Sequence, residues 1–213
     1  MPRRIPLPSN WRHHQIVAVL RAPVQDFLLP VALELHDLGV RAIEIALTSP
    51  GALAIIEELA SRIGHEAEIG AGTVLTQEQV HQAADAGATY LLSPTTDERV
   101  MRAALERGLP FIPGAGTATE IARAWDLGAS AVKVFPASSL GGPGFIRSIR
   151  DPLPHISLMP TGGIEASQVD PYFEAGAVAL GIGSPLTGDA LTGGDVADLR
   201  RRIALFMAGS LRK

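Results

Sequence analysis

Two ionisable side chains interrupt segments of the sequence that are otherwise apolar. Lys133 lies within residues 131–135, Ala-Val-Lys-Val-Phe, and Glu44 lies within residues 42–46, Ala-Ile-Glu-Ile-Ala. Burying an ammonium or a carboxylate is costly, so each group must be paired or neutral. A neutral amine adds to carbonyl groups, and a carboxyl in apolar surroundings suits general acid–base catalysis. The two residues predict covalent catalysis on a carbonyl compound; a purely structural ion pair is the alternative.

The lysine content of the chain supports a chemical role for Lys133. The sequence contains 16 arginines and 2 lysines, Lys133 and Lys213, so arginine supplies nearly all of its positive side chains. Arginine does not lose its proton in a protein, whereas a buried lysine becomes an uncharged nucleophile. A lysine in an arginine-rich chain therefore favours amine chemistry, although a coding bias explains the same count.

Polar and glycine-rich residues follow several other apolar segments. Arg21 ends the first predicted strand, near 16–21, where its planar guanidinium would hold a substrate carboxylate; a surface arginine is the alternative. Gly72 and Thr73 offer a backbone donor and a hydroxyl to a substrate. Residues 161–163, Thr-Gly-Gly, and 181–184, Gly-Ile-Gly-Ser, predict a phosphate site, since backbone N–H groups bind anions; tight packing would also require such small residues.

These residues sit on a repeated pattern in which an amphipathic segment ends in glycine and a Val/Ile/Ala-rich run follows. Glycine supplies the left-handed conformation that ends many helices, and a short run without alternation is typical of a buried parallel strand. We expect strands near 16–21, 42–47, 67–72, 89–93, 110–113, 131–135, 156–160 and 178–182. We expect helices near 24–38, 51–63, 77–87, 97–107, 118–127, 142–150, 165–175 and 192–208.

Eight βα units without a long linker predict an α/β protein with one domain over residues 1–213, a (β/α)₈ TIM barrel. Residues 1–15 would be an N-terminal extension or helix. The competing fold is a doubly wound open sheet, but the first strand lacks the Gly-rich turn expected there. Helix starts are predicted from one Ser-Pro pair and three capping boxes: Ser49–Pro50, Thr76/Gln79, Thr95/Glu98 and Thr117/Glu120.

Composition excludes several classes of function. The net charge is −4 with no basic tract, which argues against nucleic acid. No apolar stretch approaches the ~20 residues that span a bilayer, so no membrane partner is expected. The chain has no cysteine, which excludes disulfides and a thiolate nucleophile, and we expect a cytoplasmic protein. The six histidines are scattered without metal-ligand spacing, so neither a metal nor another cofactor is expected.

Collinear motifs from about residue 16 to residue 186 identify a family resemblance. The chain resembles the 2-keto-3-deoxy-6-phosphogluconate (KDPG) and 4-hydroxy-2-oxoglutarate (KHG) aldolases, together with the phosphogalactonate aldolases. The motifs that carry the resemblance are IVAVLRA (16–22), AIEIALTSP (42–50), IGAGTVLT (69–76), LLSPTTDE (91–98), PFIPGAGTATE (110–120), AVKVFPAS (131–138) and LMPTGGI (158–164).

The resemblance implies a class I aldolase that reversibly cleaves KDPG to pyruvate and glyceraldehyde 3-phosphate through a lysine Schiff base. It implies that Lys133 forms the Schiff base and that Glu44 is the general acid–base. The other positions that match the family's substrate site are Thr73 and Thr161 at the pyruvate and hydroxyl groups, Pro94 and Phe135 at the pocket walls, and Gly162, Gly163, Gly183 and Ser184 at the phosphate end. The expected partners are a phosphorylated 2-keto acid and further copies of the chain in a homotrimer.

One position departs from the family pattern. Many members carry an arginine four residues after the acid–base glutamate, where it binds the pyruvate carboxylate, whereas this chain has Thr48. Other members with this pattern have an arginine at the end of the first strand, the position of Arg21. We therefore expect Arg21 to bind the carboxylate, beside Thr48.

The substrate is predicted less sharply than the family. The phosphogalactonate branch usually has an apolar residue at the position of Thr161, which favours the gluconate epimer here. Cleavage of 4-hydroxy-2-oxoglutarate to pyruvate and glyoxylate is a further expected activity, and KDPGal (2-keto-3-deoxy-6-phosphogalactonate) is the alternative substrate. Two other functions stay open: a phosphosugar isomerase or epimerase with Glu44 as the base, and a non-catalytic barrel that binds a phosphometabolite.

Overall fold

The computed structural model describes residues 4–8, 11 and 15–210, in which parallel strands alternate with helices. The strands are β1 Ile16–Leu20, β2 Ala42–Ala46, β3 Glu68–Gly72, β4 Tyr90–Leu92, β5 Phe111–Ile112, β6 Gly114–Ala115, β7 Val132–Val134, β8 Leu158–Pro160 and β9 Leu180–Ile182. The α-helices are α1 Leu28–Asp37, α2 Ala52–Ile63, α3 Gln77–Asp85, α4 Glu98–Glu106, α5 Ala118–Asp126, α6 Gly142–Arg150, α7 Val169–Glu174, α8 Ser184–Thr187 and α9 Val196–Ser210. The predicted α/β order is confirmed over these elements.

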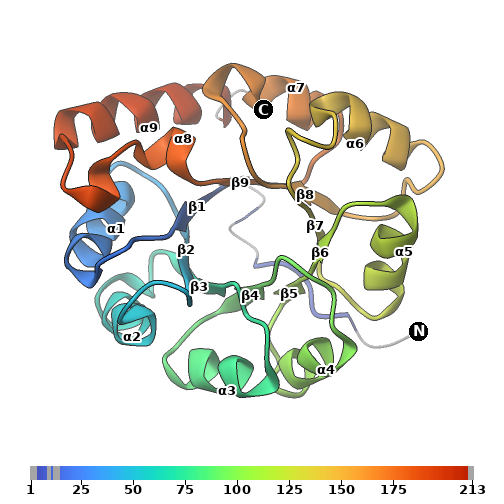
Figure 1. Cartoon of the computed structure of the whole chain (residues 1–213), viewed down its shortest axis with the longest axis horizontal. Coiled ribbons are helices and arrows are strands. Elements are labelled where there is room, and N and C mark those ends of the chain that lie inside the picture. The colour runs from blue at the N-terminus through green and yellow to red at the C-terminus, as the bar shows by residue number, and fades with distance from the viewer. Residues whose placement is uncertain (1–3, 9–10, 12–14, 211–213) are drawn as a thin grey trace.

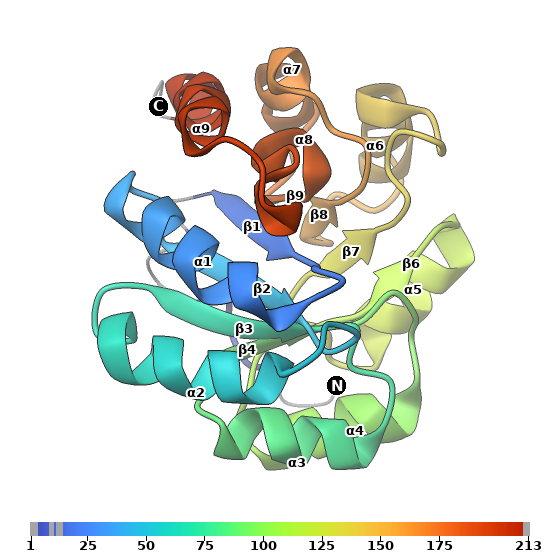
Figure 2. The same ribbon diagram turned by 60° about the vertical axis from the view of Figure 1, so that its left-hand side comes forward.

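The strands form two parallel sheets that curl around a common axis, with the helices outside them (Figure 1). One sheet has the order β5-β4-β3-β2-β1-β9, and the other has the order β6-β7-β8. β5 and β6 are separated by Pro113, which has no N–H to donate to a neighbouring strand. Figure 2 shows α2 to α4 on one side of the strands and α6, α7 and α9 on the other.

Strand alternation divides the core into two layers. Residues that face outward pack under the helices in the larger cluster. The inward-facing cluster fills the space enclosed by the strands and consists of Trp11, Val17, Ala42, Tyr90, Leu92, Ile112, Ala131, Met159 and Ala179. The rings of Trp11 and Tyr90 meet edge to face with centroids 4.9 Å apart. This apolar filling surrounds the inward positions from which Glu44 and Lys133 project.

The N-terminal segment contributes to this packing. Arg4 donates hydrogen bonds of 2.7 Å to the carbonyl oxygens of Trp125 and Ala129, and its guanidinium lies 3.5 Å from the centroid of the Trp125 ring. Trp11 belongs to the inward-facing cluster and is 3% exposed. Parts of the predicted extension therefore pack on the strands, while its residues 1–3, 9–10 and 12–14 lie outside the described part of the chain.

The predicted helix start at Ser49–Pro50 is wrong. Helix α2 begins at Ala52, and its N-cap is Gly51 at φ +69°, a left-handed conformation in which glycine has no steric penalty. The hydroxyl of Ser49 instead accepts a 3.0 Å hydrogen bond from the backbone N–H of Ala22. Ser49 therefore joins the loops after β1 and β2.

The predicted capping box at Thr95 and Glu98 is also wrong, because Asp97 caps α4. Its carboxylate accepts hydrogen bonds from the backbone N–H groups of Arg99 and Val100. The hydrogen bond from the Arg99 side chain, together with these backbone bonds, lowers the pKa of Asp97. The other two capping boxes, Thr76/Gln79 on α3 and Thr117/Glu120 on α5, are confirmed.

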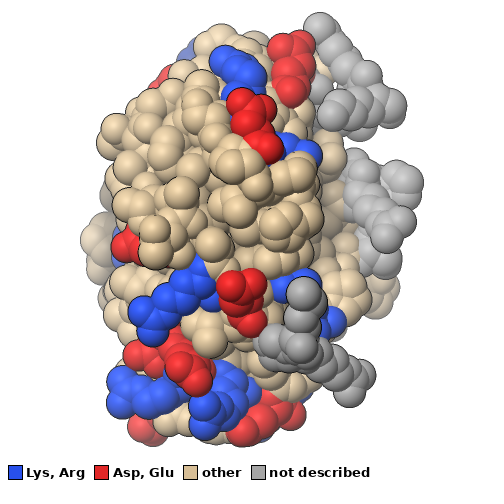
Figure 3. Space-filling view, turned by 90° about the vertical axis from the view of Figure 1, so that its right-hand side faces the viewer, with Lys and Arg blue, Asp and Glu red and all other residues tan. Residues whose placement is uncertain are grey.

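On the face shown in Figure 3, acidic and basic side chains mostly lie beside one another, and a broad upper area carries few charges. Among the described helices, none combines the length and apolar character needed to cross a membrane.

Candidate active site

The structure brings Lys133 and Glu44 together in the space enclosed by the strands. Lys133 projects from β7 and Glu44 from β2, and Lys133 Nζ lies 3.9 Å from Glu44 Oε1. The Glu44 side chain is 1% exposed and the Lys133 side chain 7% exposed. Oppositely charged groups this close stabilise each other where water is excluded. Their separation also allows a small carbonyl compound bound to the amine to reach the carboxyl.

Gly72 makes room for the Glu44 carboxylate. β3 pairs with β2 so that Gly72 stands opposite Ala46, which follows Glu44 by two residues on the same face of β2. A Cβ atom at residue 72 would lie 1.7 Å from Glu44 Oε1 and 2.5 Å from its Cδ. Glycine at this position is therefore required by close approach, since any side chain would displace the carboxylate.

Arg21 lies between the loops that follow β2 and β3. Its guanidinium donates a 2.5 Å hydrogen bond to the hydroxyl of Thr48 and a 3.0 Å bond to the hydroxyl of Thr73. Within the described chain, Thr73 is the only non-glycine residue with positive φ, at 59°. This conformation is strained for a β-branched residue and is typical of functional sites. Arg21 thus binds the two loops, and three of its five N–H donors take no part in these two bonds.

Phe135 and Pro94 line one cleft beside Lys133. The Phe135 ring centroid lies 5.5 Å from Lys133 Nζ, and the Phe135 side chain is 40% exposed. The cleft has a volume of about 420 Å³ and also takes in residues of the loops after β4 and β6. The Phe135 ring therefore lies near the buried amine and also lines this cleft.

The residues expected at the phosphate end follow β8 and β9. Thr161 is 5% exposed and pairs with Gly181 in a parallel bridge. Gly162 and Gly163 have φ values of +101° and +69°, which glycine adopts without strain. Gly183 is the N-cap of the four-residue helix α8, and Ser184 is its first residue.

Ser138 and Tyr90 also lie near this site, but neither stood out in the sequence. A Cβ atom at Gly163 would lie 2.2 Å from the Ser138 hydroxyl, and Ser138 N–H donates a 3.1 Å bond to the carbonyl of Gly162. Tyr90 is fully buried in the inward-facing cluster. The alternation of β4, which places Tyr90 and Leu92 on one face, is the signal that would have found Tyr90.

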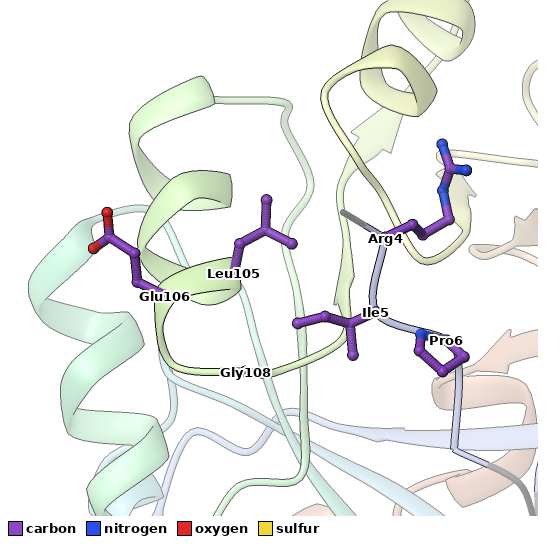
Figure 4. Close-up of a pocket in the computed structure, with 6 residues that line it drawn as sticks. All are labelled: Arg4, Ile5, Pro6, Leu105, Glu106 and Gly108. Atoms are coloured by element: carbon purple, nitrogen blue, oxygen red, sulfur yellow. The ribbon is translucent and has the colours of Figure 1, made fainter. Parts of the chain in front are cut away.

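A separate cavity of about 460 Å³ lies away from this chemistry (Figure 4). It is formed by the N-terminal segment and by the end of α4, which leads into the start of β5. The residues that line it are Arg4, Ile5, Pro6, Leu105, Glu106 and Gly108. In folds with parallel strands surrounded by helices, active sites lie at the carboxyl ends of the strands. This cavity lies at the amino ends, away from Lys133 and Glu44. In the part of the chain that is described, no group of three or more His, Asp or Glu side chains could hold a metal ion.

Comparison with known proteins decides the family. The family model described as "KDPG and KHG aldolase" matches residues 7–201. The chain belongs to this family. The predicted family and the predicted enzyme class, an aldehyde-lyase, are both confirmed.

Individual KDPG/KHG aldolase relatives carry different names. The chain is 37% identical to a probable 2-dehydro-3-deoxy-6-phosphogalactonate aldolase of Rhizobium meliloti, over 96% of this chain and 95% of the relative. It is 36% identical to a 2-dehydro-3-deoxy-phosphogluconate aldolase of Treponema pallidum, over 74% of this chain and 75% of that relative. A solved structure described as native KDPGal matches with a TM-score of 0.84 at 33% identity, over 91% of this chain and 93% of that one.

The position of Gly72 in this aldolase yields a testable consequence. Gly72→Ala should lower aldolase kcat/KM by about 100-fold, because it would displace Glu44, the expected acid–base group, and a shift of about 1 Å in such a group has an effect of that order. The melting temperature should fall as well, because a Cβ atom 1.7 Å from Glu44 Oε1 forces a buried side chain to move. Steady-state kinetics and thermal denaturation measure the two quantities.

Gly144→Ala is the matched control. Gly144 lies in α6, and a Cβ atom there would meet nothing within 4 Å. This variant should keep wild-type activity. Equal activity of the Gly72 and Gly144 variants would show that the position of Glu44 does not depend on the space left by Gly72.

Proposed function

We propose that this aldolase is a class I enzyme that cleaves KDPG to pyruvate and glyceraldehyde 3-phosphate, with Lys133 as the Schiff-base lysine. The observation that carries the proposal is the buried pair in which Lys133 Nζ lies 3.9 Å from Glu44 Oε1. Covalent catalysis by lysine needs an amine that gives up its proton and a neighbouring group that transfers protons, and the Glu44 carboxylate beside Lys133 can serve as that group.

In the proposed reaction, Lys133 Nζ attacks the C2 carbonyl carbon, and Glu44 transfers protons as the carbinolamine loses water to form a protonated imine. The C3–C4 bond then breaks, its electron pair moves toward the imine nitrogen, and Glu44 takes the C4 hydroxyl proton through a water molecule. Glyceraldehyde 3-phosphate leaves. The remaining enamine is protonated at C3, and hydrolysis of the imine releases pyruvate and restores the amine. The imine serves because it accepts electrons better than a ketone.

The substrate would lie along the carboxyl ends of the strands. Arg21 would bind the carboxylate, because a guanidinium held by two threonine hydroxyls presents its other N–H donors in a fixed plane. Thr73 and Thr161 would line the pyruvate and hydroxyl groups. Gly162, Gly163, Gly183 and Ser184 would bind the phosphate through backbone N–H groups and a hydroxyl.

We also propose that the strands form one closed (β/α)₈ barrel and that residues 1–213 are a single domain. Two contacts support closure: the parallel bridge between Thr161 and Gly181, and a 2.9 Å hydrogen bond from the N–H of Val178 to the carbonyl of Leu158. β5 and β6, divided by Pro113, then act as one of the eight strands. A homotrimer and a cytoplasmic location stay predictions from the sequence.

KDPGal is the second candidate substrate. The relative from Rhizobium meliloti, 37% identical, is named for the galactonate compound. The placement of Arg21 beside Thr48 also fits the phosphogalactonate branch, which tends to lack arginine at the position of Thr48.

Trapping tests the proposed mechanism. Borohydride reduction in the presence of pyruvate should attach one reduced pyruvyl group to Lys133, detectable by peptide mass spectrometry, because borohydride reduces the imine to a stable amine. Lys133→Met should show no adduct and no aldol cleavage. Lys213→Arg, which removes the other lysine, should be modified like the wild type. An active enzyme with Lys133 unmodified would favour the isomerase or epimerase instead.

Arg21→Met tests carboxylate binding. KM for the keto acid should rise about 10- to 100-fold, the effect of losing hydrogen bonds to a charged group, while kcat falls less. Arg200→Met is the control, since Arg200 lies on α9 and pairs with Glu34 on the surface. An unchanged KM for the Arg21 variant would assign the carboxylate to another residue.

Parallel assays decide the substrate. Pyruvate release from KDPG, KDPGal and 4-hydroxy-2-oxoglutarate can be followed by coupling to lactate dehydrogenase. We expect the highest kcat/KM with KDPG, because the Thr161 hydroxyl is buried directly after β8, the strand that pairs with β7. Thr161→Val should reduce this preference by about 10-fold, the effect of removing a buried hydrogen bond. A higher kcat/KM with KDPGal would reverse the assignment.

A further inference from the structure

Three buried polar atoms in the space enclosed by the strands make no hydrogen bond to any described residue: Trp11 Nε1, Tyr90 Oη and Glu44 Oε2. Burying such atoms without partners costs free energy, so native proteins satisfy them, often with an internal water. Their chemistry is complementary. The indole N–H is a donor, the phenol hydroxyl both donates and accepts, and the carboxylate accepts.

The strand register places Tyr90 and Glu44 in one row across the sheet. Gly70 on β3 stands opposite Glu44 on one side and opposite Tyr90 on the other. A Cβ atom at Gly70 would lie 2.3 Å from both Cε2 and Cζ of Tyr90. The ring of Tyr90 therefore lies across β3, and its hydroxyl, bonded to Cζ, is directed toward β2 and Glu44. Two strand spacings put the Cα atoms of Tyr90 and Glu44 roughly 10 Å apart.

We propose that Tyr90 is a positioning residue for Glu44, to which it donates a hydrogen bond through one buried water on Glu44 Oε2. This inference rests on the proposed role of Glu44 as the acid–base group. Oε1 of the carboxylate faces Lys133, so the water would occupy the oxygen on the other side. Trp11, whose ring meets that of Tyr90 edge to face, closes the same space from the N-terminal segment.

The hydroxyl of Tyr90 is suited to act as a permanent donor. Burial, together with the nearby carboxylates of Glu44 and Glu68, raises the pKa of Tyr90 well above its ordinary value. The phenol thus keeps its proton throughout the working pH range. A hydrogen bond donated to a carboxylate stabilises its charged form, which is the form that accepts the C4 hydroxyl proton during cleavage.

The charged groups around Glu44 come from several strands. Lys133 on β7 is 3.9 Å away, Glu68 begins β3, and Arg21 follows β1 and bonds to Thr73 beside Gly72. Once substrate is bound, Lys133 is part of the imine. The pH dependence of kcat, which reports groups in the enzyme–substrate complex, therefore isolates Glu44 better than that of kcat/KM.

Tyr90→Phe tests the proposal, since it removes the hydroxyl and keeps the ring. The acidic limb of the kcat–pH profile should move to higher pH by about one unit, and kcat below that limb should fall by about tenfold. Tyr172→Phe is the matched control. Tyr172 is the only other tyrosine, is fully buried on α7 and also has an unbonded hydroxyl, but it lies in the outer cluster. Its profile should match that of the wild type.

A second experiment strengthens the Tyr90 donor instead of removing it. It uses fluorotyrosine and does not depend on whether Tyr90→Phe folds. In the Tyr172→Phe background, incorporation of 3-fluorotyrosine labels Tyr90 alone. The more acidic phenol is a stronger donor, so the acidic limb should move to lower pH. An acidic limb that stays in place in both experiments, or moves equally in the Tyr172 variant, overturns the proposal. A melting temperature change without a pH shift overturns it as well.

Borohydride trapping in the same proteins separates this inference from the proposed function. Tyr90→Phe should still form the pyruvyl adduct at Lys133, because the hydroxyl does not touch the amine. Failure to trap pyruvate in the wild type counts against the Schiff-base mechanism. Normal trapping with an unmoved acidic limb counts against the role of Tyr90 alone.

Discussion

The exclusion of water from one lysine and one carboxylate is the constraint on which the rest of this structure depends. Lys133 and Glu44 are almost completely buried and lie 3.9 Å apart. An ion pair is stronger in such surroundings than in water, but each charge also loses its hydration, so neither group is stable there without the other. Under the proposed mechanism, the Lys133 amine must also lose its proton before it attacks a carbonyl.

The small residues of the sheet follow from that constraint. Gly72 leaves space for the carboxylate of Glu44, and Gly70 leaves space for the ring of Tyr90. Gly181 does the same for Thr161, since a Cβ atom at residue 181 would lie 2.4 Å from the threonine hydroxyl. Glu44, Tyr90 and Thr161 thus each lie beside a glycine on a neighbouring strand. This packing holds polar groups at fixed positions among apolar neighbours.

The placement of Arg21 illustrates how, in a parallel sheet, a side chain from one strand can take the place of a side chain from another. Where the family resemblance implies an arginine, four residues after Glu44, this chain has Thr48, whose hydroxyl accepts a hydrogen bond from Arg21. Parallel strands end at the same edge, so an arginine from β1 and one from the loop after β2 can serve one substrate group. The strained backbone of Thr73 is stabilised by the second bond from the same guanidinium.

Much of this protein was determined by the sequence alone. Apolar runs, terminal glycines and their regular spacing predicted the order of the strands and helices. An isolated lysine and an isolated glutamate within those runs predicted the buried pair, because burial of charge is so costly that it rarely occurs without a function. Local signals were weaker where alternatives lay within a few residues: Asp97 rather than Thr95 caps α4, and Gly51 rather than Ser49 caps α2. Only the tertiary structure decided that Arg21 binds Thr48 and Thr73, and that Gly70 lets Tyr90 lie toward Glu44. Those contacts depend on strand register and on the direction of side chains from separate strands, which no local pattern of residues encodes.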